Sequence, residues 1–123
     1  MKILRTTIIL ATLLMALISY AQINSNKNKQ ETMKTFIIER EIPNAGELTQ
    51  EQLRGISQKS NQVLSEMGTE IEWLHSYVAN QKVYCLYKAK NEELILEHAE
   101  KGGFPANSIS EVENEIGPKT AKD

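Results

Sequence analysis

Cysteine, proline and glycine are scarce in this chain of 123 residues, which contains one cysteine, three prolines and six glycines. A single cysteine cannot close an internal disulfide, so a disulfide-stapled scaffold is excluded. We expect Cys85 to be a small buried apolar side chain; the alternative is an exposed thiol that pairs with another chain. The remaining composition, 41% hydrophobic and 24% charged, is typical of one ordinary globular domain with short additional segments.

An excess of charge is also missing, because the chain has 14 Lys and Arg residues and 16 Asp and Glu residues, for a net charge of −2. No basic surface therefore indicates nucleic acid as a partner, and no acidic block indicates a disordered tail. The common catalytic motifs are absent too: the sequence contains no GxSxG, P-loop, HExxH, dinucleotide-binding glycine motif or CxxC pair. The sequence motifs thus favour no enzyme class.

The first 21 residues are almost wholly apolar and carry two charges, Lys2 and Arg5. A charged start, an apolar run of 15 residues and small residues at Ser19 and Ala21 predict a secretory signal peptide over residues 1–21. The alternative is a membrane anchor, but the run is shorter than the roughly 20 residues that span a bilayer. We therefore expect an exported protein, periplasmic or secreted, with no membrane attachment after cleavage.

Residues 22–33 are polar and contain one branched aliphatic residue. They bury too little apolar surface to offset the entropy of ordering, so they are expected to be a disordered tether. The folded domain is expected over residues 34–116, followed by a polar tail at 117–123.

Within the expected domain, short β-rich runs alternate with two amphipathic segments. Thr49 and Gln52 form a capping-box pattern before apolar residues that recur at three- and four-residue steps, and Asn91 begins a second such segment. The predicted elements are a strand at 34–41, a helix at 50–67, strands at 71–78 and 83–89, a helix that ends near residue 100 and a strand at 108–113. This β-α-β-β-α-β order is the α+β ferredoxin-like fold, in which two helices cover one face of a four-stranded antiparallel sheet.

The sheet face without helices is expected to carry the functional side chains. A hairpin loop of two or four residues places Tyr77 opposite Tyr84 and His75 opposite Leu86, whereas a three-residue loop or a bulge would pair His75 with Cys85. Strand alternation then predicts two surfaces. The open surface contains Ile37, Glu39, Glu41, Trp73, His75, Tyr77, Tyr84 and Leu86; the helix-facing surface contains Phe36, Ile38, Leu74, Ser76, Val78, Val83, Cys85 and Tyr87. Because the open surface is rich in large apolar side chains, we expect it to join two copies in a homodimer.

Four side chains are candidate metal ligands: His75, Glu39 and Glu41 on the open surface, and His98 on the second helix. Imidazole and carboxylate groups suit divalent transition metals. Each histidine also has a structural interpretation. His75 is then a hydrogen-bonded or interface residue, and His98 lies at the rim of the core near a helix C-terminus. The residue pattern alone leaves both interpretations open.

Six segments carry a family resemblance: FIIEREIP, SNQVLSEMG, IEWLHSYV, VYCLYKA, NEELILEHA and GGFPANSISEV. Together they resemble a family of small bacterial domains of unknown function, some of which are described as nickel-binding proteins. The resemblance implies a ferredoxin-like fold, a dimer and a bound divalent transition metal ion such as nickel. Relatives carry His or Gln at position 75, and because an amide is a poor ligand, the resemblance ranks His98 and the two glutamates above His75.

Three functions follow from these observations. The first is an exported, non-catalytic metal-binding protein that buffers or carries the ion. The second is an enzyme of the dimeric α+β barrel kind, in which the open surface encloses a small organic substrate. The third is a self-association module.

Overall fold

The computed structural model describes Met15 and residues 32–122, and Thr32–Asp123 form one compact unit of the chain. The predicted signal peptide, apart from Met15, and the predicted tether, apart from its last two residues, lie outside the described residues. None of the described helices is long and apolar enough to cross a membrane.

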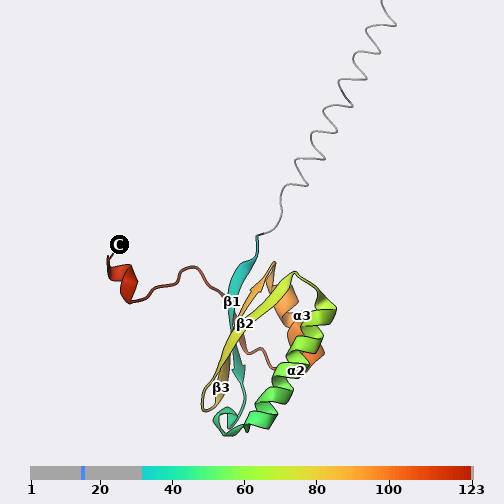
Figure 1. The fold of residues 1–123 in the computed structure, drawn as a ribbon. Helices are drawn as coiled ribbons and strands as arrows, with labels where there is room; N and C mark the ends of the chain where they lie inside the picture. The colour runs from blue at the N-terminus through green and yellow to red at the C-terminus, as the bar shows by residue number, and fades with distance from the viewer. Residues whose placement is uncertain (1–14, 16–31, 123) are drawn as a thin grey trace, which may run out of the picture. The chain divides into compact units, whose positions relative to one another are not determined.

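The unit consists of one four-stranded antiparallel sheet and two helices that cover one of its faces (Figure 1). The strand order is β2-β3-β1-β4, which confirms the predicted α+β ferredoxin-like fold. Most element boundaries lie within two residues of their predicted positions. The elements are β1 (Lys34–Glu41), η1 (Ala45–Glu47), α2 (Gln50–Met67), β2 (Ile71–Val78), β3 (Lys82–Ala89), α3 (Glu92–Gly102), β4 (Ser108–Glu111) and η2 (Pro118–Lys122).

Capping residues define the ends of both helices. In the capping box of α2, Gln52 N donates to Thr49 Oγ1 at 3.2 Å and Thr49 N donates to Gln52 Oε1 at 2.9 Å. At the start of α3, Leu94 N donates to Asn91 Oδ1 at 3.1 Å. The helix ends at Gly103, whose φ of 69° lies in the left-handed region that glycine enters without a steric penalty. The caps predicted at Thr49 and Asn91 are confirmed.

The hydrophobic core lies between the sheet and the two helices. Cys85 is 4% exposed, so its expected burial is confirmed. Three polar side chains are also buried, Arg40 and Ser60 at 4% and His98 at 1% exposure. The apolar members are Phe36, Ile38, Ile71, Cys85, Tyr87, Ala89 and Ile95.

A β-bulge at Leu74 changes which side chains of β2 face the helices. The predicted pairs from His75 to Val78 are present, but the register shifts between Trp73 and His75, so that Trp73 pairs with Tyr87. The predicted placement of Trp73 on the open surface and of Leu74 on the helix side was wrong. Trp73 packs against the core, and Leu74 is 37% exposed. One extra residue in a strand inverts the alternation of the residues that precede it.

Candidate functional site

The open face is the sheet surface opposite α2 and α3, and its centre is apolar and aromatic. Tyr77 is the most exposed side chain at this centre, at 62%. Cross-strand pairing joins Tyr77 to Tyr84 and, on the next strand, Tyr84 to Glu39. The central side chains of the open face are Ile37, Leu74, Tyr77, Tyr84 and Leu86.

A groove of about 640 Å³ crosses the open face beside the segment that follows β4. This segment is tied to the sheet because Val112 N donates to Thr35 O at 2.8 Å. Glu113 and Glu115 line the same groove as His75. One exposed imidazole and two carboxylate side chains therefore border one depression in the surface.

The His75 ring stands edge-on to Tyr77, with 5.1 Å between the ring centroids and 76° between the ring planes. The pair lies on the part of β2 that follows the bulge, where the predicted register is present. His75 is exposed, so its imidazole is accessible to an ion from solvent. This geometry supports contact with a metal ion from the open side.

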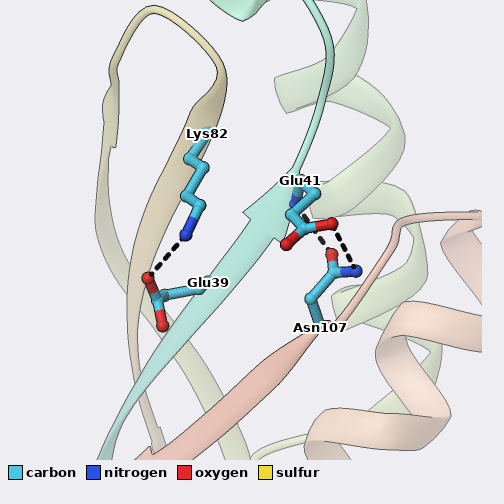
Figure 2. Close-up of polar contacts among 4 residues, drawn as sticks. All are labelled: Glu39, Glu41, Lys82 and Asn107. Carbon is cyan, nitrogen blue, oxygen red and sulfur yellow. Dashed lines mark hydrogen bonds and ion pairs between the residues drawn. The ribbon is translucent and has the colours of Figure 1, made fainter.

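Glu39 and Glu41 project from β1 on the side away from the helices, and each has a partner (Figure 2). Glu39 Oε1 lies 3.4 Å from Lys82 Nζ, and the negative charge of Glu39 raises the pKa of Lys82. Glu41 N donates to Asn107 Oδ1 at 2.7 Å, and Asn107 Nδ2 donates to Glu41 Oε2 at 3.4 Å. Exposed ion pairs of this kind contribute little free energy, so Glu39 can exchange Lys82 for another cation at small cost.

His98 lies in the core on the helix side of the sheet. Its Nε2 is 3.1 Å from Ser60 Oγ, and its ring centroid is 5.3 Å from that of Tyr87 and 5.5 Å from that of Phe104. Burial, together with the positive charge of Arg40, lowers the pKa of His98 to about 4. The imidazole is therefore neutral at pH 7, and its buried Nδ1 has no hydrogen-bond partner among the described residues.

The structure does not bring the four predicted ligands together in one protomer. His98 lies on the helix side, whereas His75, Glu39 and Glu41 lie on the open side. Even on the open face, His75 is on β2 and the two glutamates are on β1, and β3 lies between these strands. Within the described part of the chain, no three His, Cys, Asp or Glu side chains are grouped to hold a metal ion. The predicted ligand set stays a prediction.

Two features of possible sites were missed in the sequence. Glu113 was placed at the end of the predicted strand 108–113 and Glu115 just after it. No local sequence pattern connects either residue with His75. Arg40 was not singled out, although the inward positions Phe36 and Ile38 place every second residue of β1 on the helix side. The alternation of β1 thus places the charged Arg40 at a core-facing position, and this could have marked it as a candidate functional residue.

Three comparisons with known proteins bear on this arrangement. The family described as nickel responsive protein SCO4226-like matches residues 36–112. The crystal structure of SCO4226 from Streptomyces coelicolor A3(2) is similar, with a TM-score of 0.57 and 21% sequence identity over 67% of this chain and 99% of that chain. At this identity the structural likeness supports the fold. No curated protein matches the sequence significantly.

Proposed function

Since the chain belongs to the SCO4226-like family of nickel-responsive proteins, we propose that it is an exported, non-catalytic protein that binds a divalent transition metal ion, nickel in particular, as a buffer or carrier. The family description supports a metal ion as the ligand. The charged and apolar composition of residues 1–21 supports export.

The observation that carries this proposal is the exposed His75 imidazole in the groove that Glu113 and Glu115 also line. Imidazole nitrogen and carboxylate oxygen are common ligands of nickel and its neighbours in the first transition row. His75 is assigned as the nitrogen ligand. Because no three such side chains are grouped among the described residues of one copy, the oxygen ligands would be carboxylates of the open face that side-chain movement or a second copy brings to His75. Glu39 and Glu41 are available on the same face for a second copy of the chain.

His98 is assigned to the core rather than to the metal, contrary to the order that the family resemblance implied. Its ring is enclosed by Ser60, Tyr87 and Phe104. The positive charge of Arg40 already disfavours a proton on this imidazole, and it would repel a metal cation in the same way.

A homodimer through the open face is part of the proposal. Tyr77 and Leu74 are 62% and 37% exposed, and they lie beside the partly buried Leu86. Large apolar side chains gathered on one face of a small domain are commonly covered by a second copy. A two-fold axis through this face would bring the two His75 side chains to the same interface.

Isothermal titration of the chelator-stripped protein with Ni²⁺ tests the metal site. We expect saturable binding that His75→Gln weakens by at least about tenfold, since an amide replaces the imidazole ligand. Glu113→Gln/Glu115→Gln should weaken it as well. The matched control is Glu66→Gln/Glu100→Gln, which removes two exposed carboxylates from the helices and should leave the affinity unchanged. Equal nickel affinity in the wild type and His75→Gln would contradict the assignment.

A further inference from the structure

A second cavity, of about 190 Å³, lies on the opposite side of the sheet, between α2 and the strands. Ile56 and Val78 line it and are 40% and 42% exposed, which places its mouth at these two side chains. The other walls are mainly apolar and include Leu53, Trp73, Val83 and Phe104. This cavity is separate from the groove that contains His75.

Arg40 lines this cavity and is its charged group. Two of its three nitrogens have partners that belong to the fold: Nη1 donates to Pro105 O at 2.6 Å, and Nε donates to Cys85 Sγ at 3.4 Å. The guanidinium also lies over the Phe104 ring, with 5.6 Å to its centroid. The third nitrogen, Nη2, is buried and has no hydrogen-bond partner among the described residues.

The charge of Arg40 is not balanced by its neighbours. Its partners are a carbonyl, a thiol and an aromatic ring, and the Tyr87 phenol is a further polar neighbour. None of these groups is an anion, and the ion pairs of the described residues join lysines to glutamates and do not include Arg40. Burying a cation without an anion is strongly unfavourable. An anion beside the guanidinium would offset this cost and supply the acceptor that Nη2 lacks.

We propose that this cavity binds a small monocarboxylate with an apolar body, its carboxylate beside Arg40 and its apolar part toward Ile56 and Val78. The apolar walls favour an organic acid over a hydrated inorganic anion. An apolar cavity of about 150 Å³ accommodates benzene. A cavity of about 190 Å³ therefore suits a ligand of roughly eight non-hydrogen atoms.

Tyr87 adds a second polar group at the Arg40 end. Its ring lines the cavity, and burial raises the pKa of its phenol, so that the hydroxyl keeps its proton. A protonated phenol can donate a hydrogen bond to a carboxylate oxygen. Arg40 and Tyr87 thus supply a charge and a hydrogen-bond donor, and apart from the hydroxyls of Ser57, Ser60 and Ser76 the remaining lining side chains are apolar or the thiol of Cys85, which matches an amphipathic acid.

Trp73 is the single tryptophan of the chain and lines the cavity, so its fluorescence reports occupancy. The titration uses hexanoate, in EDTA, so that a metal ion on the open face plays no part. Hexanamide, an uncharged molecule of the same size, and acetate, which lacks the apolar tail, are the matched ligands. We expect saturable binding of hexanoate and affinities at least about tenfold weaker for hexanamide and acetate.

Arg40→Met removes the charge and keeps an unbranched, flexible side chain. It should weaken hexanoate binding by roughly ten- to a hundredfold and leave hexanamide unaffected. Arg54→Met, at an exposed arginine of α2, should bind hexanoate as the wild type does. Ile56→Phe narrows the mouth without touching the core and should also weaken binding, so the test holds even if Arg40→Met does not fold. The proposal is overturned if hexanoate does not bind the wild type, if hexanamide binds equally well, or if folded Arg40→Met retains full affinity.

Discussion

Ser60 of α2 and His98 of α3 form a buried polar contact, with 3.1 Å between Ser60 Oγ and His98 Nε2. Both side chains are at most 4% exposed, so the contact is largely shielded from bulk water. The contact joins the two helices at one defined position within a mainly apolar layer. It therefore fixes how α2 and α3 lie relative to each other, which apolar packing alone specifies less strictly.

Ser60→Ala should lower the free energy of unfolding by about 1–3 kcal/mol, because His98 Nε2 is then buried without a partner. Urea denaturation measures the change. The control is Ser65→Ala on the same helix, where the exposed hydroxyl bonds only the local carbonyl of Gln62, and a change near zero is expected there. A similar loss in both variants would show that the buried contact contributes no specific stability.

Acid should destabilise the protein through His98. Its pKa is about 4 in the folded protein and about 6.5 in an unfolded chain. Between these values the unfolded chain binds a proton that the folded protein does not, so stability is full above pH 6.5 and is lost as the pH falls toward 4. The pKa difference corresponds to a loss of roughly 3 kcal/mol.

The measurement is the urea midpoint between pH 4 and 7 for the wild type and His98→Phe, which keeps an aromatic ring and removes the titrating group. The variant should show a smaller decline over this range. Parallel curves for the two proteins would rule out His98 as the group responsible.

Tyr77→Glu should convert the proposed dimer to a monomer, because it places two like charges near the centre of a two-fold interface. Size-exclusion chromatography with light scattering at micromolar concentration gives the mass. Leu96→Glu is the control, since Leu96 is 49% exposed on α3, away from the open face. A wild type that is already monomeric would refute the dimer, and a dimeric Tyr77→Glu protein would place the interface elsewhere.

The order and type of the elements could be predicted because their signals are local. The capping box of Thr49 and Gln52, the Asn91 cap and the glycine after each helix all act within a few residues. Strand alternation likewise predicted the register of the hairpin from His75 onward. These features need no knowledge of the tertiary structure.

A bulge was one alternative for this hairpin, but its position at Leu74 could not be predicted, because alternation assumes one residue for each step of a strand. The bulge leaves Leu74 outside the pairing and places Trp73 opposite Tyr87, where its ring contacts the core. The Trp73 Nε1 then donates to Ser76 Oγ at 2.9 Å. The register of β2 before the bulge is therefore the one that packs the Trp73 ring against the core.

The environments of Arg40 and His98 depend on residues that are distant in the sequence. Arg40 donates to the carbonyl of Pro105, 65 positions away, and His98 contacts Ser60, 38 positions away. The sequence offered a core-rim and a metal-ligand interpretation of His98. Its near-complete burial, at 1% exposure, emerges only when the two helices are packed together.

The bulge in β2 lies in an edge strand of the sheet. In the strand order β2-β3-β1-β4, the two outermost strands are β2, which contains the bulge, and β4, which has four residues. An irregular strand and a short one both offer poor templates for the backbone of another chain. We therefore expect the folded domain to resist the addition of a strand from another molecule, and amyloid-like growth, at both edges of the sheet.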